Sequence, residues 1–256
     1  MTQLPAAFLE LDPDYAVKSY LKDPEFMFKT GMGGVLNAVA LLLTALFAQS
    51  PWFIPLAMVV TALVAGYQLR TARKRIEDPR TNLPNWDTWG ELLFGGLTWL
   101  AVQFAWNVLA AIPITIALIM TTVGLSSYSN SVPAVTALMA TLLFVILFVS
   151  LGTHFLLSYL QLNFANEEKL SAAFNFGKVF VYLIRHPRQM LLAWIISFEM
   201  QLFAVLLPAL TLVGVFLIPS TLFAAQLVGI TIMAQVWNSA LEEEKYAPVR
   251  VEKKAD

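Results

Sequence analysis

Three long stretches of the chain contain almost no charged side chain, and this feature limits the folds that the chain can adopt. Residues 31–69 and 92–166 contain no Asp, Glu, Lys or Arg, and residues 189–241 contain only Glu199. Charged residues make up 13% of the chain, about half the usual share of a soluble domain. Because so few charges cannot cover a water-soluble fold of this size, we interpret the three stretches as buried in lipid.

Each uncharged stretch is long enough to cross a membrane twice. About 20 apolar residues span the hydrocarbon core, so each stretch is expected to fold back once and form a hairpin. Proline and small polar residues interrupt the stretches at 49–51, 126–133 and 208–219, as expected for turns between helices. The sequence therefore predicts an all-α transmembrane bundle of three hairpins, with spans at residues 33–50, 53–72, 92–122, 134–163, 189–212 and 215–238.

The basic residues predict the orientation of these spans. All 16 Lys and Arg residues lie outside the hairpin tips, in four segments: 1–30, 70–91, 167–188 and 242–256. Because Lys and Arg near span ends stay on the cytoplasmic side, these segments are predicted to lie inside and the tips outside. The predicted organisation is a cytoplasmic N-terminal segment at residues 1–30, a membrane domain at 31–241 and a charged cytoplasmic tail at 242–256. The N-terminal segment is predicted to be retained, because it is too acidic for a signal peptide.

One cytoplasmic segment is predicted to form a helix that lies along the membrane surface. Residues 169–185 place apolar side chains at helical spacing, while Asn175 and Lys178 occupy the opposite face. The following dipeptide, His186 and Pro187, is predicted to end this helix, because proline disfavours helical backbone in the residue before it.

A second surface helix is predicted over residues 86–94. Thr88 precedes Glu91 by three residues, which is the spacing of a capping box at a helix start. Asp87 and Glu91 could also share one helix face as a pair of acids. We favour the capping interpretation, because acidic residues are common in the first turn of a helix. The two tryptophans of this segment suit the headgroup region of a membrane.

The nine residues LPNWDTWGE, at positions 83–91, resemble a box found in a family of membrane proteins from archaea and bacteria, including photosynthetic ones. The family is domain of unknown function number 4013. As in the family, a basic stretch precedes the box, and the segment KDPEF at residues 22–26 is similar to the family's opening. Asn85 departs from the pattern, because an acidic residue is common there. The resemblance implies an integral membrane protein, implies no particular activity, and singles out Leu83, Pro84, Trp86, Asp87, Trp89 and Gly90 at the cytoplasmic interface.

The sequence contains no motif for catalysis or cofactor binding. With two histidines and no cysteine, the chain cannot build a metal centre from several histidines or from thiolates. It also lacks a G-x-S-x-G motif, a P-loop and a dinucleotide-binding fingerprint. We therefore expect no enzymatic activity, no cofactor, no metal site and no nucleic-acid partner, and we leave contact with lipid or pigment open.

A layer of polar residues is predicted inside the membrane. Glu199 lies about ten residues into its predicted span, near a depth of about 15 Å at 1.5 Å per residue. A charged acid at that depth costs about 3 kcal/mol on insertion scales, so Glu199 needs a partner or a proton. His154 has nearly the same predicted depth and is the predicted partner. The layer as a whole comprises Gln103, Asn107, His154, Glu199 and Gln226.

This layer has three interpretations. We favour structural hydrogen bonds between helices; a transport or proton path comes second, and ligation of a pigment or cofactor by His154 third. For the whole chain we expect a non-catalytic accessory subunit or assembly factor of a larger membrane complex, in contact with lipids and another membrane protein. A transporter or channel for a small solute or lipid is the alternative, and a membrane enzyme fits least well. The expected location is a bacterial inner membrane or a thylakoid-type membrane.

Overall fold

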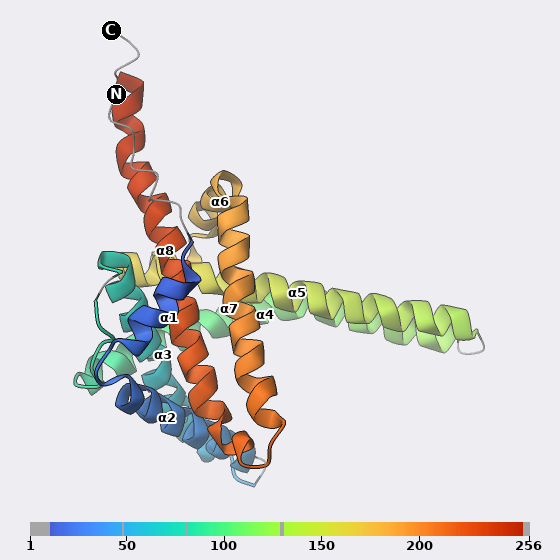
Figure 1. The fold of residues 1–256 in the computed structure, drawn as a ribbon. Coiled ribbons are helices and arrows are strands. Elements are labelled where there is room, and N and C mark those ends of the chain that lie inside the picture. Colours follow the sequence, from blue (N-terminus) through green and yellow to red (C-terminus); the bar gives the residue numbers. More distant parts are fainter. Residues whose placement is uncertain (1–10, 48, 80, 129–130, 253–256) are drawn as a thin grey trace. The chain divides into compact units, whose positions relative to one another are not determined.

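The described part of the chain is helical. The computed structural model describes residues 11–252, apart from residues 48, 80, 129 and 130. In that part, secondary structure consists of α-helices and two short 3-10 helices (Figure 1). In chain order they are α1 (Pro13–Leu21), α2 (Phe26–Leu46), α3 (Phe53–Glu77), α4 (Trp89–Tyr128), α5 (Val132–Glu167), η2 (Leu170–Phe174), α6 (Phe176–Arg185), α7 (Pro187–Ala209), η3 (Gly214–Leu217) and α8 (Ile218–Glu252).

The predicted all-α membrane fold with six spans is confirmed. Among the described residues, six helical segments are long and apolar enough to cross a membrane: α2, α3, α4, α5, α7 and Gly214–Glu244, which comprises η3 and most of α8. Several helices are longer than the predicted spans, and α8 continues to Glu252 through part of the predicted tail. A helix satisfies its backbone hydrogen bonds internally, so it can continue from lipid into water without interruption. Lys253 and Lys254, also in the predicted tail, lie outside the described residues.

The separate surface helix predicted over residues 86–94 is wrong. Trp86 belongs to an irregular strap, residues 83–88, and the helix that begins at Trp89 is the third membrane span itself. Trp86 is also buried in the protein rather than placed among headgroups. Its aromatic surface is covered by other parts of the chain, which a local pattern of amphipathic residues cannot show.

The surface helix predicted over residues 169–185 is interrupted. Asn175 has a non-helical backbone and its side chain accepts a hydrogen bond from the Lys178 amide, so it caps α6 and separates it from η2. Asparagine competes with helical hydrogen bonding in this way, and here the cap prevails over the apolar periodicity. The predicted end of the helix is confirmed, because His186 follows the last residue of α6 and Pro187 begins α7.

The chain forms two compact units. The first comprises Met1–Leu100 and Tyr159–Asp256, and its described core is α8 packed against α7, α2 and α3. Asp12, just before α1, exchanges two backbone–side-chain hydrogen bonds with Gln235 of α8. The second unit, Ala101–Ser158, is an antiparallel hairpin made from the remaining parts of α4 and α5. Within it, a Cβ at Gly124 would lie 2.8 Å from the Leu138 side chain, so the two helices approach closely there.

Small residues allow α3 and α4 to touch through their backbones. A Cβ at Gly66 would overlap the carbonyl oxygen of Leu92, and a Cβ at Gly96 would overlap that of Ala62. Small residues four positions apart commonly permit such close approach between membrane helices. The partner of the Ala62–Gly66 pair is therefore the first part of α4 in the same chain.

A second contact between small residues joins α2 to α8. A Cβ at Gly33 would overlap the ring of Phe223, and a Cβ at Gly34 would overlap Ser220. At Gly31, by contrast, an added Cβ meets nothing within 4 Å. Of these three glycines, only Gly33 and Gly34 are therefore required by the packing.

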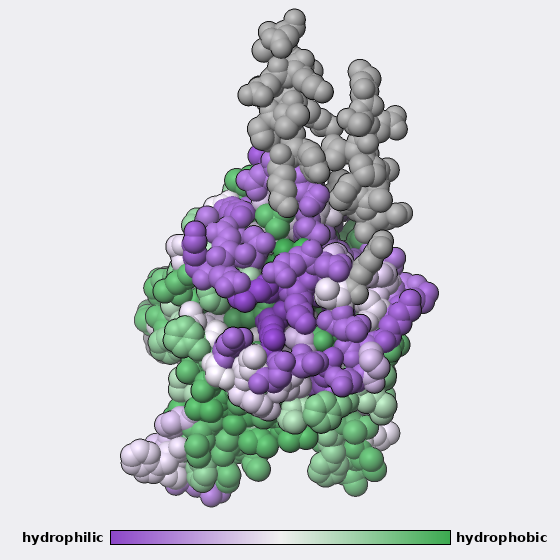
Figure 2. Space-filling model, turned by 90° about the vertical axis from the view of Figure 1, so that its left-hand side faces the viewer, coloured by the Kyte–Doolittle hydropathy of each residue, from purple (hydrophilic) through white to green (hydrophobic). Residues whose placement is uncertain are grey.

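Hydrophilic and hydrophobic surface areas of the first unit lie at different positions along its helices. The α2–α3 and α7–α8 turns lie at one end, while α1 and α6 lie toward the other (Figure 1). Figure 2 shows a hydrophilic area on one part of the surface and a largely hydrophobic area below it. At the hydrophilic end, Tyr182 of α6 donates a hydrogen bond to Glu244 of α8, and His186 lies 3.0 Å from Glu243. Burial and this hydrogen bond raise the pKa of Tyr182.

Candidate functional site

A buried ion pair lies beneath the strap formed by residues 83–88. The Asp23 carboxylate accepts from the Lys29 ammonium at 3.0 Å, and both side chains are nearly inaccessible, at 0% and 5% exposed. Asp23 also accepts from the backbone amides of Leu83 and Glu25, each at 2.8 Å, while Lys29 donates to the Leu83 carbonyl at 3.0 Å. The pair therefore satisfies both backbone polar groups of Leu83.

The next residues of the strap are also held by their carbonyl oxygens. The Pro84 carbonyl accepts from the Tyr67 hydroxyl at 2.8 Å, and the Asn85 carbonyl accepts from Arg70 at 3.3 Å. Both donors lie on α3. The Asn85 side chain is exposed, so its contribution to the strap is made by the backbone. Because the contact uses the backbone, an asparagine side chain fits at this position, where an acidic residue is common in the pattern that the box resembles.

Trp86 fills the space between the strap and the helices. Its ring stacks on Tyr67, with centroids 4.0 Å apart, and lies 6.2 Å from the ring of Phe223 on α8. Its indole nitrogen donates to the backbone carbonyl of Lys29 at 3.2 Å. Buried tryptophan combines a large apolar surface with one donor that needs a partner, and both needs are met here.

Arg70 closes the strap on its exposed side. Its guanidinium lies 2.8 Å from Asp87 and donates to the Thr88 hydroxyl at 2.6 Å. This hydrogen bond holds the pKa of the Asp87 carboxyl below its ordinary value. Thr88 directly precedes α4, and its carbonyl accepts the Leu92 amide, so the predicted helix start lies close to the observed one. Asp87 pairs with Arg70 and lies before the first residue of α4, so the alternative in which Asp87 and Glu91 share one helix face is wrong.

The box therefore forms a clamp between distant segments. Leu83 and Trp86 are buried, and residues of α2, α3 and the α1–α2 connection hold the strap in place. In the sequence, the segments 22–26 and 83–91 stand out separately, and no pattern in them predicts the contact between Asp23 and Leu83. A signal was available in Lys29, the last charged residue before an uncharged stretch.

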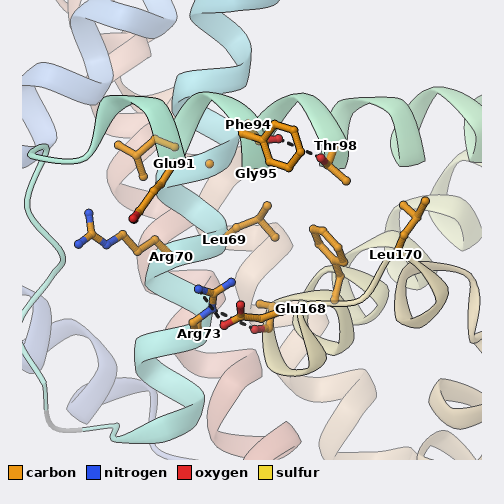
Figure 3. A pocket seen from close by; sticks show the side chains of 13 residues that line it. Leu69, Arg70, Arg73, Glu91, Phe94, Gly95, Thr98, Glu168 and Leu170 are labelled. Atoms are coloured by element: carbon orange, nitrogen blue, oxygen red, sulfur yellow. Dashed lines mark hydrogen bonds and ion pairs between the residues drawn. The ribbon is translucent and has the colours of Figure 1, made fainter.

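A cavity of about 720 Å³ lies between α3, the start of α4 and the end of α5, and Arg70 of the clamp is among the residues that line it (Figure 3). Arg73 of α3 lies 2.9 Å from Glu168 and donates to the Ala165 carbonyl at 3.3 Å. Glu168 directly follows α5 and has a left-handed conformation, with φ of 56°, which turns the chain toward η2. The cavity is lined by Gly66, Leu69, Arg70, Arg73, Glu91, Leu92, Phe94, Gly95, Thr98, Phe164, Ala165, Glu168 and Leu170.

Two members of the predicted polar layer belong to the first unit. Gln226 of α8 accepts a hydrogen bond at 2.8 Å from Gln68 of α3, a residue that the sequence analysis did not select. Ser197 of α7 donates to the Gly229 carbonyl, and this contact sets the register of the antiparallel helices. In that register Glu199 and Gln226 lie at nearly the same position along the two helix axes, but the Glu199 side chain is exposed.

The other members belong to the second unit. Asn107 donates to the Gln103 carbonyl at 2.8 Å, one turn earlier on α4. Asn107 and His154 line one cavity of about 330 Å³ together with Ser150 and Thr153 of α5. The structure therefore brings the amide and the imidazole to the same hollow within the hairpin. The predicted pairing of His154 with Glu199 would join the two units, and it stays a prediction.

These sites offer hydrogen-bonding groups and charged side chains. Among the described residues, no group of three or more His, Asp or Glu side chains is placed to hold a metal ion. The clamp is occupied by contacts within the chain, whereas the two cavities provide space for another molecule. Arg70 and Arg73 offer guanidinium groups at the larger cavity, and Asn107 and His154 offer an amide and an imidazole at the smaller one.

Comparison with known proteins gives one match. The family model described as "Protein of unknown function (DUF4013)" covers residues 51–218, from before α3 to the first residue of α8. No curated protein and no solved structure matches the chain. The strap lies inside the matched region, whereas Asp23 and Lys29 lie before it. Because the match covers more than half of the 256 residues, this integral membrane protein belongs to the DUF4013 family.

Proposed function

We propose that this chain is a non-catalytic accessory subunit or assembly factor of a larger membrane complex. The observation that carries the proposal is the polar hollow of the second unit, where Asn107 and His154 lie within a hairpin that contains no charged residue. Polar side chains inside hydrocarbon are costly unless they are hydrogen-bonded, and between membrane helices they act as contact points. The proposed occupant is a transmembrane helix of another protein that presents a polar side chain.

The apolar composition of the hairpin supports the same proposal. Two helices in a hairpin bury only one face of each against the other, so their remaining faces require lipid or further protein. Large apolar side chains such as Phe144 and Phe148 are exposed on α5 and stack on each other. Lipid covers such faces without specificity, whereas the hollow adds the hydrogen-bonding groups that distinguish one partner helix from another.

Native complexes test the proposal directly. We expect the chain, extracted in a mild detergent from its own membrane at natural abundance, to migrate as part of a larger assembly with a stoichiometric partner. Asn107→Leu combined with His154→Phe is expected to reduce recovery of that partner several-fold, because each interhelical hydrogen bond contributes about 1 kcal/mol. Thr141→Val is the matched control, since the Thr141 hydroxyl bonds only to its own helix at Ala137 in the described contacts.

Two results would contradict the proposal. The first is a chain that migrates alone from native membranes, without a stoichiometric partner. The second is a partner that survives the double substitution as well as it survives Thr141→Val. Pigment bound near His154 would instead favour ligation, and absorption of the purified complex before and after His154→Phe separates the two outcomes.

The alternative function is transport of a small solute or lipid. It is supported by Gln68 and Gln226, which are hydrogen-bonded at nearly the level of Glu199. An acid within a membrane span often marks a path for protons or ions. If this function holds, Glu199→Gln abolishes uptake in reconstituted vesicles while the protein remains folded. Unchanged uptake in that variant excludes a role for the carboxylate.

The proposal includes an orientation with both termini in the cytoplasm of a bacterial inner membrane or the equivalent side of a thylakoid-type membrane. It rests on the distribution of Lys and Arg and on the contact between Asp12 and Gln235, which places the residue before α1 beside the last turn of the sixth predicted span.

Cysteine labelling tests this orientation on a clean background, because the chain contains no cysteine. We expect an impermeant maleimide added to intact cells to label Ser50→Cys and Ser131→Cys in the hairpin tips. Ser19→Cys and Ser171→Cys should react only after the membrane is opened. Labelling of a tip and a basic segment from the same side would refute the topology.

A further inference from the structure

We infer that the 720 Å³ cavity between α3, α4 and α5 is a binding site for a phospholipid with a zwitterionic headgroup, such as phosphatidylethanolamine. The inference concerns the first unit only and does not depend on a protein partner. Three observations carry it: the position of the cavity along the helices, the presence of both charged and exposed apolar side chains in its walls, and the distribution of its charges.

The cavity lies where three segments pass from uncharged to charged sequence. Arg70 is the first charged residue after 31–69, and Glu91 is the last before 92–166. Glu168 lies just beyond the end of the second stretch. In a membrane protein such transitions mark the boundary between hydrocarbon and headgroups. A cavity lined by all three residues is therefore expected at the depth of the lipid headgroups.

The walls of the cavity match an amphiphile. Figure 3 shows the charged side chains Arg73 and Glu168 together on one side, with Phe94 on the helix across the cavity. Phe94 and Leu170 are 76% and 55% exposed although both are large and apolar. An acyl chain lying against these two side chains would cover them, while its headgroup remains beside the charges.

The charges favour a zwitterion over an anion. Two guanidinium groups and two carboxylates line the cavity, and the Asp87 carboxylate lies beside Arg70, so the site carries no net positive charge that would select an anion. Arg73 pairs with Glu168 and Arg70 with Asp87, while Glu91 takes part in no ion pair among the described residues. A phosphate can accept from guanidinium N–H groups beyond those used in the two ion pairs, because each guanidinium carries five donors, and an ammonium can approach Glu91. A purely anionic headgroup would meet no net positive charge and would place negative charge beside Glu91.

The experiment measures lipid binding by native mass spectrometry of the full chain in detergent. The probes are phosphatidylethanolamine and phosphatidylglycerol with identical acyl chains, and soluble phosphoethanolamine as a competitor. We expect preferential retention of one phosphatidylethanolamine, and a threefold to fivefold loss of that affinity in Glu91→Gln, which is about the effect of one exposed charge pair. Binding of phosphatidylglycerol with equal or higher affinity would overturn the zwitterionic assignment.

Glycines on α4 supply a pair of matched variants. Gly95 lines the cavity, and a Cβ there meets nothing within 4 Å, so Gly95→Trp fills the cavity without a clash at the backbone. Gly90 is equally open but does not line the cavity. We expect Gly95→Trp to abolish selective lipid retention and Gly90→Trp to preserve it, both with unchanged thermal unfolding.

The results with the two tryptophan variants and with soluble phosphoethanolamine also test the proposed lipid site. Equal lipid loss in both tryptophan variants, or retention in both, would overturn the location of the site. Full competition by soluble phosphoethanolamine at the lipid's own concentration would show that a free headgroup compound, and not a lipid, is the ligand. Weak competition is expected, because the acyl chains contribute the apolar contacts.

Discussion

Replacing Asp23 with alanine is expected to lower the free energy of unfolding by about 3–5 kcal/mol, because among the described carboxylates the buried Lys29 ammonium then keeps only the exposed one of Glu25, at 3.5 Å. It also removes the acceptor of the Leu83 amide, which is buried beneath the strap. Lys29→Met is expected to cost less, since Asp23 then keeps the amides of Leu83 and Glu25. Thermal unfolding of the purified variants in one detergent gives this order.

The N-terminal region supplies a matched control for the buried pair. Asp14 and Lys18 form an ion pair one helical turn apart in α1, but their side chains are 71% and 64% exposed. Such exposed pairs contribute little because water and salt screen them. Asp14→Ala should therefore unfold like the unaltered protein. If Asp23→Ala unfolds at the same temperature as Asp14→Ala, the clamp does not stabilise the fold.

Gly96→Ala is the second substitution with a large expected effect. A Cβ at this position would overlap the Ala62 carbonyl oxygen and lie 2.8 Å from the Gly66 amide nitrogen. Both neighbours are backbone atoms of α3, so no flexible side chain can move away. The helices must separate, and overpacking of this kind typically costs about 1–3 kcal/mol and sometimes more. Unfolding temperature and the yield of monodisperse protein measure the loss.

The neighbouring glycine is the control for this prediction. An added Cβ at Gly95 meets nothing within 4 Å, and alanine has a higher helix propensity than glycine. Gly95→Ala should therefore leave stability unchanged or raise it slightly. Equal stability of Gly95→Ala and Gly96→Ala would mean that α3 and α4 do not touch at these residues.

Composition alone predicted most of the membrane fold. Transfer of a charged side chain into hydrocarbon is so unfavourable that residues 31–69 and 92–166 could be assigned to lipid without knowledge of their contacts. The turn around Pro51 is another local signal, because proline restricts the backbone wherever it occurs. The six apolar helices of the structure confirm these predictions.

Local sequence patterns gave wrong predictions for two segments, residues 169–185 and residues 86–94. Residues 169–185 have the apolar spacing of one helix, yet Asn175 breaks them by capping α6. Trp86 suits a membrane surface by composition, yet it is buried against Tyr67. Neither outcome can be derived from periodicity, because each depends on which hydrogen-bond or ring partner is within reach.

The sequence by itself determined which segments enter the membrane and which end of each hairpin carries charge, since both follow from the solvation of individual side chains. Only the tertiary structure decided that Asp23 and Lys29 hold Leu83, and that Gln226 bonds to Gln68. These partners lie far apart in the chain. Their meeting depends on how closely the helices pack, and that distance is set by small residues such as Gly66 and Gly96 acting together across two helices.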